Sequence, residues 1–142
     1  MDYSYIIIPI IVLITSQIIK LATDKIKGNF DIRHVLLSYG GMPSSHTAFA
    51  TSITALLALR FGLDAPVTAI AFVFTVLIAR DAVSFRNILG NQGRLLNKLL
   101  DKMPKKDQED IPRFREKMGH SVAEVLAGAG LGIILTYLLN LL

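Results

Sequence analysis

The stretch GGMPSSHTAFA, residues 40–50, decides how the rest of this sequence is interpreted. It places two serines, a histidine and a threonine at the start of an apolar run that continues to Leu63. Lipid solvates none of these polar groups, so they either turn toward protein and water or act at a membrane surface. Pro43 stands where a helix would begin, a position at which its missing N–H is no loss. We therefore predict a membrane-spanning helix over Pro43–Leu63 whose polar end lies at a surface.

The composition supports a membrane setting. Hydrophobic residues make up 52% of the 142, yet the chain carries 15 Lys and Arg against 11 Asp and Glu, a net charge of +4. This mixture suits apolar spans joined by charged loops better than one soluble core. There is no cysteine, which excludes a disulfide framework and a thiolate metal site. The first residues include Asp2 and no basic residue, so we expect the N-terminal apolar run to stay as an anchor.

Four segments approach the roughly 20 residues that a bilayer core of about 30 Å requires. They are Tyr3–Ala22, Pro43–Leu63, Ala65 to about Ala79, which is short unless it continues through Arg80 and Asp81, and Ser121–Leu142. Between the third and fourth, RLLNKLLDKM (residues 94–103) places its leucines on one helical face, which is typical of a helix lying in the membrane interface. The charged stretch after it, PKKDQEDIPRFREK (residues 104–117), contains Pro104 and Pro112 and suits a mobile, solvated linker.

The predicted fold class is therefore all-α. We expect an integral membrane helical bundle of about four transmembrane helices plus one interfacial amphipathic helix. Residues 1–142 would form a single membrane-embedded domain, with a polar connection at about 82–119.

The basic residues predict the orientation of the spans. Four of them lie in the first connection, counted from Lys20, and ten lie in the third, so fourteen of the 15 share one side of a four-span bundle. The positive-inside rule makes that side cytoplasmic and places both termini outside. The polar motifs MPSSH (42–46), ARD (79–81) and MGHSVAE (118–124) then converge on the cytoplasmic surface.

The residues at this surface suit an anion such as phosphate. Ser44, Ser45 and the free N–H groups of a helix start form an anion site through geometry and the helix dipole. Lys20, Arg80 and Arg86 could supply permanent positive charge, and arginine is suited to bidentate contact with phosphate oxygens.

Two histidines, His46 and His120, stand at the starts of their predicted helices. Beside a phosphate, one imidazole can attack phosphorus while the other protonates the departing oxygen. Glu124 lies four residues after His120 and could orient its ring, which makes His120 the predicted nucleophile. A single histidine at a membrane edge is often just an interfacial residue. A carboxylate inside a span is costly, however, and favours a functional role.

Three stretches together resemble the divergent branch of the type 2 phosphatidic acid phosphatase and vanadium haloperoxidase superfamily. They are GGMPSSHTA, ARDAVSFRNILGNQGRLLN and MGHSVAEVLAGAGLG. The branch is similar over nearly the whole chain and also has a Gln and a Lys near the end of the first span, here Gln17 and Lys20 in SQIIK.

The resemblance implies a metal-independent phosphatase that works through a phosphohistidine intermediate and needs no cofactor. By position in the motifs, His46 would be the general acid, His120 the nucleophile and Glu124 its orienting carboxylate. Ser44 would be a phosphate ligand, Ser45 replaces the family's glycine, and Lys20 stands for the lysine of the first motif.

The motifs depart from the wider superfamily at one informative place. Phe114 stands where an arginine usually precedes the nucleophilic histidine by six residues, so we expect Arg80 and Arg86 of ARDAVSFR to bind phosphate instead. Asp81 could pair with either arginine as a structural ion pair, or orient a histidine.

We therefore predict a lipid phosphatase in the cell membrane, with its active site on the cytoplasmic side. Its substrate would be a phosphate monoester or diphosphate on a lipid, such as phosphatidylglycerol phosphate or phosphatidate. The alternatives are a prenyl diphosphate phosphatase, a lipid-phosphate-binding protein without catalysis and, more remotely, a small transporter or a haloperoxidase. The expected partners are the lipid substrate, membrane lipids and a second copy of the chain in a homodimer, and we expect no nucleic acid.

Overall fold

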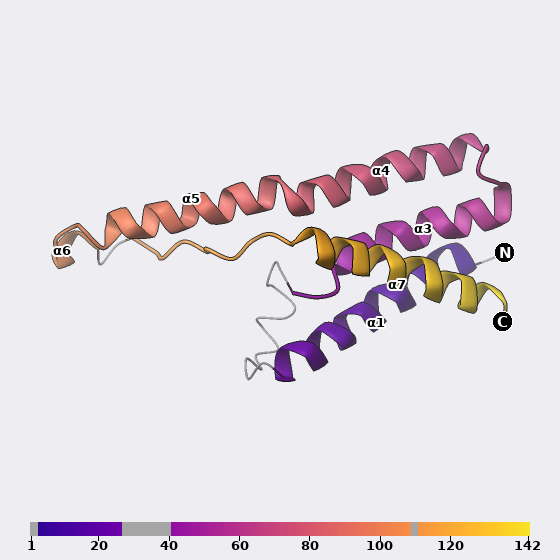
Figure 1. The fold of residues 1–142 in the computed structure, drawn as a ribbon, viewed down its shortest axis with the longest axis horizontal. Coiled ribbons are helices and arrows are strands. Elements are labelled where there is room, and N and C mark those ends of the chain that lie inside the picture. The colour runs from indigo at the N-terminus through magenta and orange to yellow at the C-terminus, as the bar shows by residue number, and fades with distance from the viewer. Residues whose placement is uncertain (1–2, 27–40, 109–110) are drawn as a thin grey trace.

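A computed structural model describes residues 3–26, 41–108 and 111–142, and within these ranges every regular element is a helix. The helices are α1 (Ser4–Ile26), α3 (Ser45–Phe61), α4 (Pro66–Val83), α5 (Phe85–Leu100), α6 (Lys105–Gln108) and α7 (Val122–Asn140). Helices α1, α3, α4 and α7 form a bundle, and α5 and α6 project from one end of it (Figure 1). The prediction of an all-α fold is confirmed.

Helix α3 lies at the centre of the bundle, in contact with α1, α4 and α7. Its buried positions carry alanine, serine and threonine with a single leucine, Leu56. Between helices in lipid there is no hydrophobic driving force, so small side chains that let backbones approach closely give the best packing. The polar residues of this apolar run therefore build the centre of the bundle.

The closest packing is between α3 and α7. A Cβ atom added at Gly128 would meet the backbone of Ser44, and one at Gly132 would meet the carbonyl of Ala48. Two turns beyond the first pair, the Ser52 and Thr136 hydroxyls share a 2.6 Å hydrogen bond. The contacts advance by four residues on both helices, so α3 and α7 run parallel and begin at the same end.

Contacts at the ends of α1 and α4 give the directions of these two helices. The ring of Tyr5, at the start of α1, stacks on Phe61 at the end of α3, with ring centroids 5.9 Å apart. The chain turns into α4 at Gly62, which has φ +94°. Helices α1 and α4 thus run opposite to α3, and the start of α1 and the end of α7 lie at the end of the bundle away from α5 (Figure 1).

Three described helical stretches are long and apolar enough to cross a membrane. They are Ser4–Thr23, one within Pro66–Leu100, and Val122–Asn140. Helix α4 passes through Arg80 and Asp81 to Val83, so the third predicted span has its longer form. Helix α3 has 17 residues, the lower limit of the roughly 17 to 25 that span a bilayer. The crossing by α3 remains a prediction.

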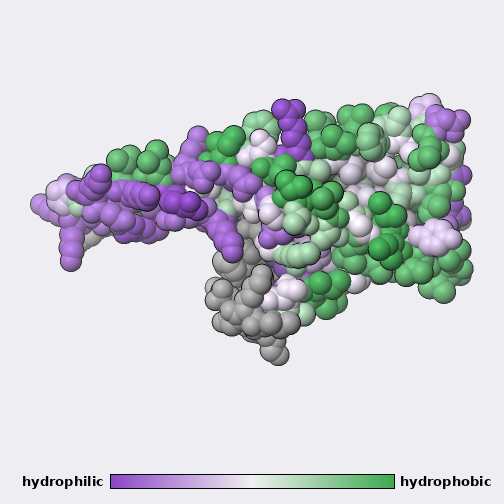
Figure 2. Space-filling view, viewed as in Figure 1, coloured by the Kyte–Doolittle hydropathy of each residue, from purple (hydrophilic) through white to green (hydrophobic). Residues whose placement is uncertain are grey.

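The predicted amphipathic helix starts earlier than expected and points in a different direction. Helix α5 begins at Phe85, directly after a break in helical geometry at Ser84, and continues the direction of α4 (Figure 1). It does not lie across the end of the bundle. The projection is hydrophilic on much of its visible face, with an apolar patch along its upper edge (Figure 2).

One face of α5 holds the returning chain, residues 111–119, which we call the return segment. The backbone carbonyls of Glu116 and Arg115 lie where Cβ atoms at Gly90 and Gly93 would be. Asn97 brackets Phe114, because its Nδ2 donates to the Phe114 carbonyl and its Oδ1 accepts from the Phe114 N–H, both at 2.9 Å. Residues 111–117 are exposed, as expected for a solvated linker. Two glycines and a buried amide nevertheless hold the segment extended against the helix, so the expectation of a mobile loop does not describe it.

Replacing Asn97 with alanine should release the return segment. The substitution removes both hydrogen bonds that hold the Phe114 backbone, a loss of roughly 0.5–1.5 kcal/mol for each bond. We expect trypsin to cleave after Arg113 and Arg115 about tenfold faster or more, as followed by mass spectrometry in mild detergent. Asn91→Ala, at an exposed position of the same helix, should cleave at the wild-type rate. Equal rates in both variants would contradict the bracketing role.

Candidate functional site

Four parts of the chain meet at the end of the bundle from which α5 projects. They contribute Lys20 from α1, His46 from the first turn of α3, Arg86 from the first turn of α5, and His120 just before α7. The charges of Lys20, Arg86 and His46 all act on His120, and those of Arg86, Lys20 and Asp81 act on His46. The structure therefore brings both predicted histidines and two predicted cations into one site.

His120 is fixed through its backbone. Its side chain is buried, with the residue 4% exposed. Its N–H donates to the Ala82 carbonyl at 3.0 Å, and its carbonyl accepts from Asn87 Nδ2 at 3.1 Å. The Asn87 side chain fills the space where a Cβ of Gly119 would lie. Sequence reasoning missed Asn87 as a site residue, although it stands within the stretch ARDAVSFRN that carried the resemblance.

Glu124 does not orient His120 by a hydrogen bond in the described structure. Its Oε2 accepts from the Ser121 N–H at 2.9 Å, and its own N–H donates to Ser121 Oγ at 3.2 Å. This capping box satisfies N–H groups that a helix start leaves without partners. The Glu124 carboxylate, three residues after the N-cap, is therefore used in capping its own helix, although its charge still acts on His120.

The surroundings of His120 favour the neutral imidazole. Burial lowers its pKa below the ordinary value of 6.5. The negative charge of Glu124 opposes this shift, while Lys20, Arg86 and His46 lower the pKa further. A neutral ring has the lone pair that a nucleophile needs. The Nδ1 atom is buried and finds no hydrogen-bond partner among the described residues.

This lowered pKa predicts a specific pH dependence. The folded chain holds a proton on His120 less readily than the unfolded chain does. Acid therefore favours unfolding, and the free energy of unfolding decreases as the pH falls below about 6.5. In NMR titrations of isotope-labelled histidine in micelles, we expect the His120 ring to remain neutral below that pH. Glu124→Gln should lower the midpoint further, because it removes the one charge that favours the imidazolium. A midpoint at or above 6.5 in the wild type would be inconsistent with this environment.

The two arginines of ARDAVSFR lie in different surroundings. Asp81 pairs with Arg86, with 2.6 Å between Asp81 Oδ2 and Arg86 Nε, which settles which arginine it contacts. Arg80 is exposed and is not among the charges that act on either histidine. Of the two, the structure places only Arg86 at the site.

Lys20 reaches the site along a glycine turn. The residue is 4% exposed, and its Cε atom lies 3.0 Å from where a Cβ of Gly41 would be. Gly41 also has φ +92°, a conformation that other residues rarely adopt. A glycine is therefore required here on both grounds, and it keeps the lysine stem under the chain that leads to α3.

The two serines of MPSSH differ in their surroundings. Ser44 is fully buried, its hydroxyl shares a 2.9 Å hydrogen bond with Thr47, and its N–H donates to the Glu124 carbonyl at 3.0 Å. It thus ties the start of α3 to α7. Ser45 Oγ is buried and finds no partner in the described part of the chain, and the same holds for Gln17 Oε1, one turn before Lys20.

Buried polar atoms normally have a partner, so these orphan groups mark places for water or a ligand. The nearby charges that act on the histidines are mostly cationic. Within the described ranges, no cluster of three or more His, Cys, Asp and Glu residues could hold a metal ion. The arrangement combines two imidazoles with fixed positive charge, which is chemistry suited to a phosphate group.

Comparison with known proteins gives one family and one close relative. The model of the Divergent PAP2 family matches residues 1–135. The uncharacterized membrane protein YuiD of Bacillus subtilis (strain 168) is 33% identical over 138 residues, which cover 89% of this chain and 87% of YuiD. No solved structure matches the chain at a significant level.

Proposed function

Because the chain belongs to the divergent PAP2 family of membrane proteins, we propose that it is a phosphatase of lipid phosphates. The reaction is hydrolysis of a phosphate monoester or diphosphate on a lipid, through a phosphohistidine at His120. No metal or cofactor takes part in it.

One observation carries this proposal. The exposed His46 and the buried His120 lie within electrostatic range of each other, and Lys20 and Arg86 act on both. A protein that only binds phosphate needs the cations and has no use for two imidazoles at the starts of parallel helices. A phosphoryl-transfer enzyme needs one histidine protected from bulk water as the nucleophile and one accessible histidine to exchange protons.

The reaction runs in two displacements. First, a ring nitrogen of neutral His120 forms a bond to phosphorus while the bond from phosphorus to the lipid oxygen breaks, and that oxygen takes a proton from His46. Then water attacks the phosphorus, gives a proton back to His46, and releases inorganic phosphate from His120. Lys20 and Arg86 compensate the charge on the phosphoryl oxygens, because positioning and preorganised positive charge do most of the catalysis in phosphoryl transfer.

The cytoplasmic face is the proposed location of the site. The projection and the return segment together carry nine of the 15 basic residues, namely Arg86, Arg94, Lys98, Lys102, Lys105, Lys106, Arg113, Arg115 and Lys117. The positive-inside rule assigns such segments to the cytoplasm. This side favours phosphatidylglycerol phosphate or phosphatidate over a prenyl carrier recycled outside. Reporter fusions that placed residues 42–46 outside would reverse this preference.

Phosphate release by purified protein in mixed micelles tests the function. The substrates are phosphatidate, phosphatidylglycerol phosphate and a prenyl diphosphate, each with and without chelator. We expect release that chelator does not reduce, and a loss of release in Lys20→Met. Tight binding of phosphatidate without release from any of the three would replace the enzyme with a lipid-phosphate-binding protein.

The homodimer also remains a prediction. A bundle this small has buried polar groups to satisfy, and a second copy would cover more of its surface. We expect native mass measurements in mild detergent to show two copies, and a monomer alone would contradict this.

A further inference from the structure

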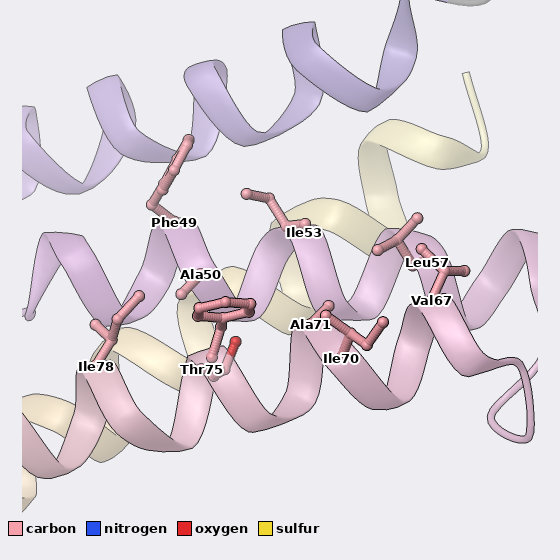
Figure 3. Close-up of a pocket in the computed structure, with 10 residues that line it drawn as sticks. Phe49, Ala50, Ile53, Leu57, Val67, Ile70, Ala71, Thr75 and Ile78 are labelled. Atoms are coloured by element: carbon pink, nitrogen blue, oxygen red, sulfur yellow. The ribbon is translucent and has the colours of Figure 1, made fainter.

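An apolar groove of about 340 Å³ runs along the bundle between α3 and α4. Phe49 and Ile78 lie at one end and Leu57 and Val67 at the other (Figure 3). Of its ten lining residues only Thr75 is polar, and the Thr75 hydroxyl is already hydrogen-bonded to Thr54 at 2.9 Å. The groove offers a ligand no polar contact, and its volume falls within the roughly 300–1,000 Å³ of small-ligand sites.

The groove and the polar site lie along the same faces of α3 and α4. On α3, Phe49, Ile53 and Leu57 follow His46 by 3, 7 and 11 residues, spacings that keep all four on one helical face. On α4, Asp81 follows Ile78 by three residues and lies one turn closer to the site. The end of the groove at Phe49 and Ile78 therefore meets the charged cluster of His46, Asp81 and Arg86.

The length of the groove matches one leaflet of a membrane. From Val67 to Ile78 the α4 helix advances about 16 Å at roughly 1.5 Å per residue, which is close to half of a hydrocarbon core of about 30 Å. The α4 wall is also open to the surroundings, with Ile70 59% and Phe74 61% exposed. A chain can therefore enter sideways from lipid.

We propose that the α3–α4 groove binds one hydrocarbon chain of the lipid whose phosphate lies at His46. The occupant is an amphipathic molecule with an anionic head, because Lys20 and Arg86 act on His46 at the Phe49–Ile78 end of the groove. At the other end Arg60 lies one turn beyond Leu57, and its Nε donates to Asn140 Oδ1 of α7 at 2.9 Å. A helix of a second copy fits less well, since it would cover the whole length of α4 and place apolar atoms against the charged end. This inference rests on the proposed function for the location of the phosphate, but it concerns binding and can be tested without turnover.

Photolabelling in nanodiscs tests the groove directly. The labelled protein carries His120→Gln, so that the probe is not hydrolysed during the experiment. The probe is phosphatidate with a diazirine at the middle of one acyl chain, and its control is diacylglycerol with the same labelled chain, which is the product that the active protein would make. After irradiation, we expect the phosphatidate label on peptides covering residues 49–57 and 67–78. Ala71→Phe, which fills the groove, should reduce this labelling about tenfold, a change worth about 1.4 kcal/mol. Ala69→Phe is the matched control, because Ala69 is exposed on α4 and does not line the groove.

Each outcome decides the proposal. Equal labelling by phosphatidate and diacylglycerol would mean that the groove only contacts bulk lipid and would overturn it. Labelling confined to other helices, or reduced equally by Ala71→Phe and Ala69→Phe, would overturn it as well, and so would photo-crosslinks between two copies through α3 and α4. Specific labelling without phosphate release in any assay would support the chain site and reject only the phosphatase.

Discussion

His120→Gln is expected to abolish phosphate release, with a loss of about a thousandfold or more. Glutamine keeps a polar side chain of similar reach at a buried position, but its amide has no nucleophilic lone pair. The covalent route is then closed, and residual catalysis comes only from binding and fixed charge, as when a nucleophile is removed from other hydrolases. The measurement is release of phosphate from phosphatidate, together with trapping of radiolabelled phosphate on the protein. The label should be stable to base, labile to acid and absent from the variant.

His46→Gln provides the comparison that separates the two histidines. A general acid contributes typically 10²–10⁴-fold, and it matters most when the leaving oxygen is a strong base. We expect His46→Gln to lose most of its activity on phosphatidate but little on p-nitrophenyl phosphate, whose leaving group needs no proton. His120→Gln should be inactive on both. Equal losses on both substrates in the two variants would refute the division of roles, and normal melting of each variant would exclude a folding defect.

Gly128→Ala is expected to destabilise the protein severely. The added methyl group would collide with the backbone of Ser44 rather than with a flexible side chain, so helices α3 and α7 must separate. Overpacking of this kind typically costs about 1–3 kcal/mol, and the lost contact between Ser44 and the Glu124 carbonyl adds to that. We expect the thermal midpoint, followed by circular dichroism in mild detergent, to fall by roughly 5–10 °C or more.

The same helix offers its own control. Gly130 has no atom within 4 Å of the position where a Cβ would lie, so Gly130→Ala adds a methyl group without a collision. Alanine also favours helix by roughly 1 kcal/mol over glycine, and this variant should melt at or above the wild-type temperature. Gly132→Ala, which meets the Ala48 carbonyl, should behave like Gly128→Ala. If all three variants melted alike, close α3–α7 packing would not be what selects glycine.

The bounds of the bundle helices could be predicted well from the sequence because the length of an apolar run is a local property. The predicted second and fourth spans differ from α3 and α7 by only one or two residues at each end. The direction of α5 could not be predicted, since it depends on how the chain after it returns. The return segment is held by Gly90, Gly93 and Asn97. These three residues lie on one face of α5, and their spacing was the signal in the sequence for this packing.

The sequence predicted which residues form the site better than it predicted the hydrogen bonds that they make. Sequence motifs indicated that His46, His120, Lys20 and Arg86 belong together, since all four fall near the predicted cytoplasmic boundary of the spans. They could not show that Glu124 would cap its own helix or that Asn87 would hold the His120 carbonyl. Competition between a local hydrogen bond and a distant one is decided by three-dimensional geometry.

The pairing of Ser52 with Thr136 also has a consequence for how the protein is made. These hydroxyls are 84 residues apart in sequence, and the chain emerges from the ribosome with its N-terminus first. While synthesis continues, α3 sits without the partner that fills its small-residue face, and neither Ser52 nor Ser44 has its final contact. Lys20 and His46 are likewise translated long before His120, which lies 74 residues after His46. A chain truncated before α7 would thus leave the buried polar groups of α3 without the partners that α7 provides.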